Sequence, residues 1–306
     1  MSPEFLLTQL LNGVQFGVLL FLMAAGLTLV FGVMSFINLA HGSLYMMGAY
    51  IAALTYGKTG SFALAILAGV VGLFVLALIL DRLAFSVLHR RDHLDQVLAT
   101  FGVVMFANEA VRFFWGNAPL YMDVPAWLAA PVPLFGFNYP AYRGAIIVAG
   151  LLVALGLHML INRTRVGMII RAGASNRDMV SALGVNIGWL TSFIFALGGA
   201  LAGLAGAMVG PILSIQPGMG EPVLILTLVV IVIGGIGSIR GAFFGALIVG
   251  IVDTLGRGVL PGVLFKVFDP SVAAAAGPAL ASVGVYVLMA AVLALKPAGL
   301  FPVRYS

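Results

Sequence analysis

Ser35-Phe36-Ile37-Asn38-Leu39-Ala40-His41-Gly42 interrupts an apolar run that otherwise continues from Val14 to Tyr56. The interruption brings an amide, an imidazole and a flexible glycine into a stretch long enough to lie in lipid. Inside a bilayer every polar group must find a partner, so a break of this kind marks either a turn at the membrane face or the end of a half-helix beside a passage. Both interpretations predict a membrane protein, and the second predicts a conduit.

The composition of the chain excludes a soluble globular fold. Charged residues make up 8% of the 306 residues and apolar residues make up 62%, whereas an ordinary globular domain has roughly 25% charged residues. One span needs roughly 20 helical residues, so a chain of this length can cross the membrane about eight or nine times. We therefore predict an all-α fold, a polytopic transmembrane helical bundle in a single membrane-embedded domain over 1–306.

Apolar runs separated by charged residues or by proline and glycine clusters predict the spans. They cover residues 5–31, 43–57, 61–80, 97–115, 142–162, 189–213, 222–236, 240–256 and 273–295. The positive-inside rule assigns the basic clusters to the cytoplasm. These clusters are Arg82/Arg90/Arg91, Arg163/Arg165/Arg171/Arg177 and Lys296/Arg304. The excess of 15 basic over 10 acidic residues is thus a topology signal and not a nucleic-acid surface.

The interruption at 35–42 has a counterpart in the second half of the chain. An ungapped alignment of 27–51 with 226–250 gives seven identities and places Gly234-Gly235-Ile236-Gly237-Ser238-Ile239-Arg240-Gly241 opposite it. Corresponding breaks in two halves of a membrane protein point to a translocation site. We therefore predict two pseudo-repeats, 5–160 and 189–296, with discontinuous helices. The residues expected beside the pathway are Asn38, His41, Gly42, Gly234, Gly235, Gly237, Ser238 and Gly241.

Many of the 39 glycines are spaced by four residues, which places them on one face of a helix. Helices in lipid have no hydrophobic drive to associate, and small residues at this spacing allow their backbones to approach closely. We therefore expect helix contacts along two faces. The first face is Gly198, Ala202, Gly206 and Gly210, and the second is Gly237, Gly241 and Gly245.

Residues 163–188 form the longest stretch that is neither apolar nor rich in proline. Ser175 followed by Asp178 matches a capping box and Gly184 is a good helix stop, so we predict a short helix at 176–183. A short, capped helix suits a rigid docking element for a cytoplasmic partner. A connecting loop whose arginines only set the topology explains the same residues.

Residues typical of enzymes and metal sites are sparse. The chain has no cysteine, which excludes thiolate ligands and cysteine nucleophiles. His89 and His93 could share a helix face as metal ligands, but the neighbouring arginines argue against it. His158 has no triad partner nearby. We therefore expect a protein with no catalytic residue, no metal and no cofactor.

Three motifs, in the same order, resemble the LivH-type permeases, the membrane subunits of branched-chain amino acid ABC importers. They are Gly26–Gly32 leading into Ile37–Gly42, the turn Gly234–Ala242, and the segment from Arg171-Ala172 to Leu183-Gly184. The resemblance covers nearly the whole chain. Importers of urea, amides and other amino acids look similar in these motifs, so the resemblance defines the family better than the substrate.

The resemblance implies a multi-pass transport subunit of the bacterial cytoplasmic membrane that works by alternating access and leaves ATP hydrolysis to its partners. The implied partners are a second, LivM-like permease, two cytoplasmic ABC ATPase subunits, an extracytoplasmic solute-binding protein and the lipid bilayer. It also implies that 163–188 is the segment that couples to the ATPases. Its coupling residues would be Arg171, Ala172, Ser175, Asn176, Asp178, Met179, Ala182, Leu183 and Gly184.

Two alternatives stay open on the sequence. The first is an ABC permease for urea, amides or another small polar solute. The second is a secondary transporter that needs no ATPase, and such proteins usually place ionisable residues within their spans. Only Glu109, Asp253 and His158 are candidates for that role, and we expect Glu109 to pair with Arg112 instead.

Overall fold

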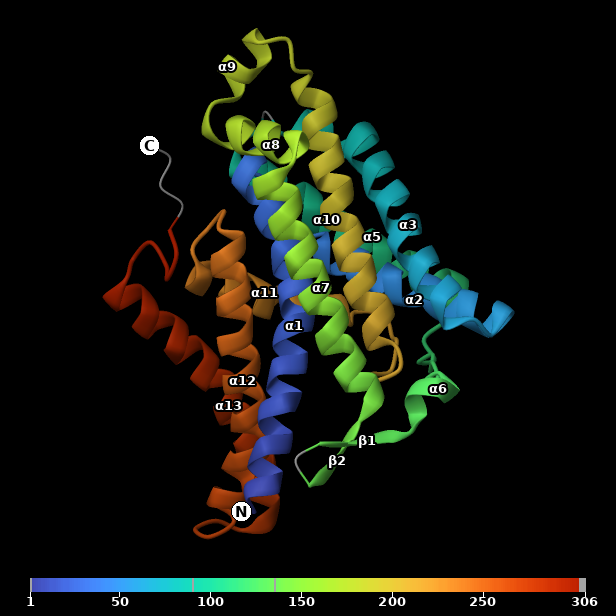
Figure 1. Ribbon diagram of the computed structural model, residues 1–306, viewed down its shortest axis with the longest axis vertical. Coiled ribbons are helices and arrows are strands. Elements are labelled where there is room, and N and C mark those ends of the chain that lie inside the picture. The colour runs from blue at the N-terminus through green and yellow to red at the C-terminus, as the bar shows by residue number, and fades with distance from the viewer. Residues whose placement is uncertain (1, 90, 135, 303–306) are drawn as a thin grey trace. The chain divides into compact units, whose positions relative to one another are not determined.

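The computed structural model describes residues 2–89, 91–134 and 136–302, which are mostly helical (Figure 1). Arg90 and Arg304, from two of the predicted basic clusters, lie outside the described residues. The first group of elements is α1 (Pro3–Met34), α2 (His41–Thr59), α3 (Phe62–Leu80), the π-helical turn η1 (Asp81–Phe85), α4 (Ser86–Leu88), α5 (His93–Trp115) and α6 (Ala126–Ala129). The remaining elements are β1 (Pro131–Leu134), β2 (Phe137–Pro140), α7 (Ala141–Arg163), α8 (Arg165–Ser175), α9 (Arg177–Ala182), α10 (Ile187–Val209), α11 (Gly220–Gly234), α12 (Ile239–Leu264) and α13 (Pro270–Leu295).

Each apolar run predicted from the sequence is a helix, which confirms the all-α membrane fold. Among the described residues, 7 helices are long and apolar enough to cross a membrane: α1, α3 continued through η1 and α4, α5, α7, α10, α12 and α13. Helix α11 has only 15 residues, or about 22 Å at 1.5 Å per residue. The expected eight or nine spans thus comprise these long helices together with the shorter α2 and α11, which border the two interruptions.

A small hairpin, β1–β2, lies between α6 and α7. Its strands pair antiparallel, with Val132 opposite Tyr139 and Pro133 opposite Asn138. The hydroxyl of Tyr139 and the guanidinium of Arg143 both donate hydrogen bonds to the side-chain oxygen of Asn12 in α1, at 3.4 and 2.8 Å. These bonds attach the hairpin and the start of α7 to the first part of α1.

The described residues divide into two compact units. The α10 unit contains residues 22–124 and 152–225, and the α12 unit contains residues 2–21, 125–151 and 226–302. Helices α1, α7 and α11 run from one unit into the other. Each unit therefore draws on segments from both halves of the chain, and the pseudo-repeats 5–160 and 189–296 stay a prediction.

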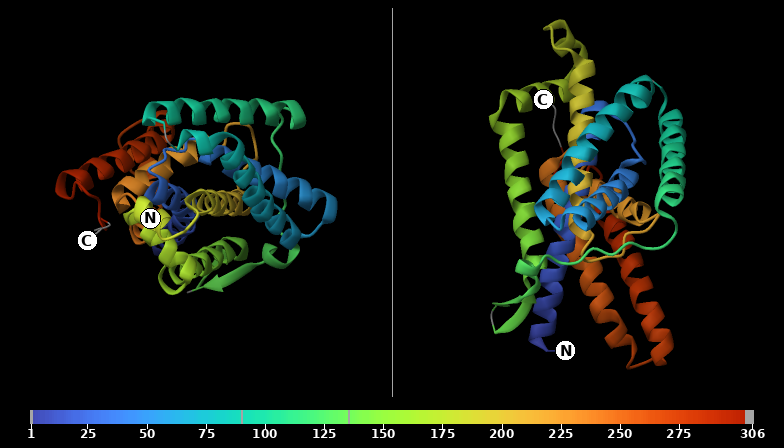
Figure 2. Two further views of the ribbon diagram at one scale, coloured as in Figure 1. Left: turned by 90° about the horizontal axis from the view of Figure 1, so that it is seen from above. Right: turned by 90° about the vertical axis from the view of Figure 1, so that its right-hand side faces the viewer.

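In the α10 unit, helices α2, α3 and α10 lie side by side (Figure 2). A Cβ atom on Gly48 of α2 would lie 2.5 Å from the Cα atom of Gly203 in α10, and one on Gly203 would lie 2.6 Å from the carbonyl oxygen of Gly69 in α3. On the predicted face of α10, Gly198 packs against the backbone of Gly26 and Gly206 against that of Tyr45. These glycines are helix contacts, as the spacing predicts.

In the α12 unit, α12 and α13 pack along each other (Figure 2). A Cβ atom on Gly256 of α12 would lie 2.8 Å from the Cβ atom of Ala281 in α13. The first part of α1 packs on α12 in the same way, because a Cβ atom on Gly13 would lie 2.8 Å from the Cα atom of Ile251. Both helix pairs depend on the absence of a side chain at the contact.

Adding one methyl group at the α2–α10 contact should destabilise the fold. The variant Gly48→Ala is expected to lower the free energy of unfolding in detergent by about 1–3 kcal/mol, because overpacking forces two backbones apart. The control is Gly102→Ala in α5, where nothing lies within 4 Å of the added Cβ atom. This control should leave stability unchanged or raise it by up to about 1 kcal/mol, since alanine favours helix. Equal stability of the two variants would contradict the contact.

Candidate functional site

The chain turns back on itself after α1. Ser35 has a φ of +50°, in the left-handed region, and its N–H donates to the carbonyl oxygen of Phe31 at 2.8 Å. His41, at the start of α2, has its Nε2 atom 3.2 Å from the carbonyl oxygen of Met23. At about 1.5 Å per residue, Met23 lies about 16 Å before Met34 along α1. Residues Ser35–Ala40, here called the re-entrant segment, therefore run back beside α1, and α2 begins next to its interior.

The backbone of the re-entrant segment is held by α5. The side-chain oxygen of Gln96 accepts a hydrogen bond from the N–H of Ile37 at 3.3 Å. The amide nitrogen of the same side chain donates to the carbonyl oxygens of Leu88 and Arg91, at 3.3 and 3.1 Å. Gln96 is buried. One buried amide thus joins the re-entrant segment to the loop that precedes α5.

An aromatic cluster encloses the side chain of Phe36. Its ring centroid lies 5.5 Å from that of Phe85, 5.3 Å from that of His89 and 6.4 Å from that of Phe195. Phe36 and Phe85 are both fully buried. The re-entrant segment is therefore anchored by packing as well as by hydrogen bonds.

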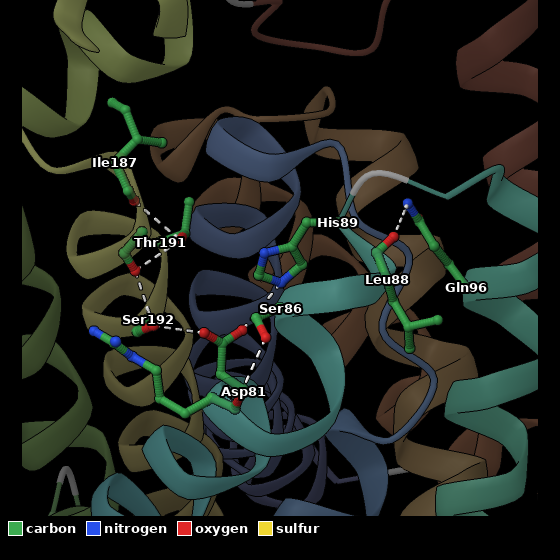
Figure 3. Close-up of polar contacts among 10 residues, drawn as sticks. Asp81, Ser86, Leu88, His89, Gln96, Ile187, Thr191 and Ser192 are labelled. Atoms are coloured by element: carbon green, nitrogen blue, oxygen red, sulfur yellow. Dashed lines mark hydrogen bonds and ion pairs between the residues drawn. The ribbon is translucent and has the colours of Figure 1, made fainter.

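Asp81 lies beside this cluster, between His89 and Ser192 (Figure 3). One carboxylate oxygen is 3.0 Å from Nε2 of His89 and the other accepts a hydrogen bond from the Ser192 hydroxyl at 2.7 Å. Asp81 is 0% exposed. The sequence suggests His89 and His93 as possible metal ligands, but His93 begins a different helix and His89 forms an ion-pair contact with Asp81. The position of Asp81 directly after the apolar run 61–80 could have indicated that its carboxylate is buried and needs a polar partner.

The predicted pathway residues at the first interruption lie inside packed protein. Asn38 and His41 are each 1% exposed. Within the described part of the chain, neither side-chain amide atom of Asn38 has a hydrogen-bond partner. A Cβ atom on Gly42 would lie 2.7 Å from the carbonyl oxygen of Gly220, the first residue of α11. The structure thus brings Asn38, His41 and Gly42 to the start of α2.

The second interruption is a tight turn. Helix α11 ends at Gly234 and α12 begins at Ile239, and between them Gly235 and Gly237 have φ values of +105° and +81°. The Ser238 hydroxyl accepts a hydrogen bond from the N–H of Gly241 at 3.0 Å and caps α12. The turn needs glycine because other residues rarely adopt positive φ.

Two further contacts close this turn. The backbones of Gly234 and Gly241 touch, so that neither position has room for a Cβ atom. The N–H groups of Leu300 and Phe301 donate to the carbonyl oxygens of Ile233 and Gly234 at 2.8 and 2.9 Å. These bonds satisfy carbonyls that the end of a helix leaves open. The two interruptions are both real, but the first is a re-entrant segment and the second a capped turn.

The segment 163–188 contains two helices, of which the sequence predicted only the second. Helix α8 begins after Thr164, whose hydroxyl accepts a hydrogen bond from the N–H of Gly167 at 3.1 Å. Gly167 lies against the carbonyl oxygens of Leu160 and Ile161 at the end of α7. The apolar spacing of Val166, Ile170 and Gly173, behind a threonine cap, was the signal for this helix.

Helix α9 confirms the predicted short helix but not its cap. Ser175 is the last residue of α8, so the predicted Ser175–Asp178 capping box is wrong. The cap is Asn176, whose side-chain oxygen accepts a hydrogen bond from the N–H of Met179 at 2.9 Å. Gly184 ends the helix as predicted, with a φ of +87° and a hydrogen bond from its N–H to Ser181 at 2.9 Å.

The predicted coupling residues form one exposed surface, here called the coupling surface. All of them are exposed: Arg171, Ala172, Ser175, Asn176, Asp178, Met179, Ala182, Leu183 and Gly184. Two are large apolar side chains, Met179 with 60% and Leu183 with 77% of its surface exposed. Figure 1 shows α9 at the top, beyond the start of α10, and α8 below α9. The structure thus gathers these residues at one end of the α10 unit.

Arg177, the first residue of α9, has a side chain that is only partly exposed. Its Nε atom donates to the carbonyl oxygen of Val33 at 2.7 Å, and its Nη2 atom donates to the same oxygen. Partial burial lowers the pKa of the Arg177 guanidinium, and the neighbouring Asp178 carboxylate opposes this. An arginine keeps its charge in such a setting. The sequence predicted only that Arg177 lies on the cytoplasmic side of the membrane.

The ionisable residues of the predicted spans have structural partners. Glu109 pairs with Arg112 at 2.5 Å, as predicted. Asp253 accepts a hydrogen bond from Arg257 at 2.8 Å within α12. Asn162 lies 3.1 Å from the ring of His158, one turn along α7. Each of these three residues thus has a partner on its own helix.

This fold defines a polytopic helical membrane protein. A family model described as "Branched-chain amino acid transport system / permease component" matches residues 9–293. The chain therefore belongs to this family of permeases. It is a multi-pass subunit of the cytoplasmic membrane, and the resemblance noted in the sequence is confirmed.

Individual relatives agree with this assignment. The chain is 30% identical over 271 residues to the high-affinity branched-chain amino acid transport system permease protein BraD of Pseudomonas aeruginosa, covering 83% of this chain and 87% of BraD. It is 31% identical over 275 residues to the permease protein LivH of Escherichia coli, covering 85% of this chain and 89% of LivH. LivH of Salmonella typhimurium is 30% identical over 275 residues, with the same coverage.

Removing the Asp81 carboxylate should destabilise the α10 unit. The variant Asp81→Ala is expected to lower the free energy of unfolding in detergent by about 2–4 kcal/mol, because it leaves buried partners unsatisfied. The control is Asp95→Ala, which removes an exposed carboxylate from the first turn of α5 and should change stability far less. Denaturant titration of both variants measures the difference. A similar small loss in both would mean that Asp81 is not a stabilising partner.

Proposed function

We propose that the chain is the permease subunit of an ATP-driven importer that moves branched-chain or similar hydrophobic amino acids by alternating access. The match of the family model to residues 9–293 carries this proposal. Relatives named for branched-chain amino acid transport are similar over most of the chain. The amino acid would arrive on an extracytoplasmic solute-binding protein, and two cytoplasmic ATPases would supply the energy.

The second membrane subunit in this proposal is a LivM-like permease. A translocation path between two permeases is lined by one face of each of them. Helices α3, α5 and α7 of this chain carry large exposed apolar side chains, such as Leu67, Phe106 and Leu152. These surfaces suit contact with lipid or with another membrane subunit, because both keep apolar side chains away from water.

The coupling surface is the proposed contact with an ATPase. Met179 and Leu183 are exposed apolar side chains on and directly after an ordered helix, and this combination suits insertion into a groove. The Asn176 cap and the left-handed Gly184 fix both ends of α9. A helix with fixed ends moves as a rigid body when the ATPase moves, whereas a flexible loop would change its own conformation instead.

The two interruptions are the proposed borders of the translocation pathway. Asn38 supports this role because a buried amide without a partner is costly, and a zwitterion in transit could satisfy it. At the second interruption, Gly234, Gly235, Gly237 and Gly241, together with Ser238, form a compact turn without bulky side chains. Small residues with a few amides suit an amino acid with an aliphatic side chain.

Reconstitution tests the proposed function. The permease, its partner permease and both ATPases in liposomes, with the solute-binding protein outside, should accumulate radiolabelled leucine, isoleucine or valine when ATP is inside. Omitting ATP should abolish uptake, and a protonophore should leave it intact. Uptake that survives without ATP and collapses with the protonophore would show a secondary transporter. ATP-driven uptake of urea or amides alone would show the alternative substrate class.

A charged residue at the tip of the coupling surface should prevent ATPase binding. The variant Leu183→Asp is expected to lower co-purification of the ATPases at least about tenfold, because a buried apolar side chain contributes roughly 1.5–3 kcal/mol. The control is Tyr121→Asp, which changes another highly exposed side chain, in the loop after α5. It should bind the ATPases normally. Normal ATPase binding by Leu183→Asp would contradict the proposed docking role of α9.

A further inference from the structure

One contact joins the coupling surface to the interior of the α10 unit. Arg177 is the first residue of α9, and its guanidinium donates two hydrogen bonds to the carbonyl oxygen of Val33. Val33 belongs to the last turn of α1, where carbonyl groups have no partner within the helix. A positive charge at this position is also attracted by the negative end of the helix dipole. Arg177 therefore caps the end of α1 from a different helix.

The capped carbonyl lies directly before the re-entrant segment. Ser35, two positions beyond Val33, turns the chain in the left-handed conformation, and Phe36 follows it into the aromatic cluster. Helix α8 touches the same place, because a Cβ atom on Gly173 would lie 3.9 Å from a methyl group of Val33. The end of α1 is thus held by both helices of the coupling segment.

The other side of the re-entrant segment is attached elsewhere. The N–H of Ile37 bonds to Gln96 of α5. Besides the packing of Phe36, the segment therefore has one hydrogen-bonded attachment through Val33 to α9 and another through Ile37 to α5. If α9 moves while α5 stays in place, the short stretch between Val33 and Ile37 must bend, and this stretch leads directly to Asn38.

We propose that Arg177 is the link that transmits movement of α9 to the re-entrant segment, so that ATPase closure changes the position of Asn38 and the start of α2. This proposal rests on the proposed coupling role of segment 163–188. Arginine suits the task because its planar fork places two donors on one oxygen and keeps its charge. The Asn176 cap holds the first turn of α9 in order, so Arg177 moves with the helix.

The test uses the complete importer in liposomes and the variant Arg177→Met, which keeps side-chain length but removes both donors. The ATPases should still co-purify, because the coupling surface is unchanged. Leucine uptake per ATP hydrolysed should fall about tenfold, since hydrogen bonds to a charged group correspond to one or two powers of ten in an equilibrium. The control is Lys58→Met, which removes an exposed cation near the end of α2, outside segment 163–188, and should keep the parental ratio.

Thiol labelling separates movement of α9 from movement of the re-entrant segment. The chain has no cysteine, so a single introduced thiol reports on one position. In the parent importer, a nonhydrolysable ATP analogue should change the labelling rate of Ser181→Cys on α9 and of Ile37→Cys in the re-entrant segment. With Arg177→Met added, the change should persist at position 181 and disappear at position 37.

Two results would overturn the proposal. One is parental uptake per ATP in Arg177→Met, and the other is an unaltered response of position 37 in that background. If Arg177→Met fails to fold, the variant Arg177→Gln, which keeps one neutral donor, carries the same test, and a parental ratio there would equally overturn the link. Failure of the coupling role itself has a different signature, because position 181 would then not respond to the ATP analogue even in the parent importer.

Discussion

The structure depends on finding partners for the backbone groups that the break after α1 exposes inside a membrane protein. An N–H or carbonyl group without a hydrogen-bond partner in such surroundings destabilises the fold by roughly several kcal/mol. The N–H of Ser35 donates to the carbonyl of Phe31, and the N–H of Ile37 donates to the side chain of Gln96. The carbonyl of Val33 accepts hydrogen bonds from Arg177. Helices α1, α5 and α9 are held together because each one supplies a partner.

Glycine supplies the second condition. Helices in lipid gain little from the hydrophobic effect when they associate, so their attraction depends on how closely the backbones approach. Contacts such as Gly48 with Gly203, or Gly13 with Ile251, leave no room for a methyl group. The same device closes both interruptions, where Gly42 meets Gly220 and Gly234 meets Gly241. Close approach thus stabilises each unit and also shapes the proposed borders of the pathway.

These two features give the proposed transport cycle a physical route. The coupling surface is exposed and ordered, whereas the re-entrant segment is mostly buried and is held by hydrogen bonds and by the packing of Phe36. A single guanidinium joins them across 144 positions of sequence. The permease in this view needs only weak contacts with its substrate, because the energy comes from the ATPases and acts through α9.

The sequence by itself determined the helical spans, the glycine contacts of α10, the position of both interruptions and the stop at Gly184. The second predicted glycine face is wrong at Gly237, which lies in the turn before α12 with a φ of +81°. Hydropathy, small-residue spacing and helix-end preferences act over a few residues, so the sequence carries them locally. Helix α8 and the Asn176 cap of α9 are local features, but the prediction missed both. Only the tertiary structure decided that Asp81 pairs with His89 and Ser192, and that Arg177 reaches Val33. The partners of Asp81 and Arg177 are chosen by the packing of segments far apart in the chain, and no local pattern specifies which distant group a buried charge will meet.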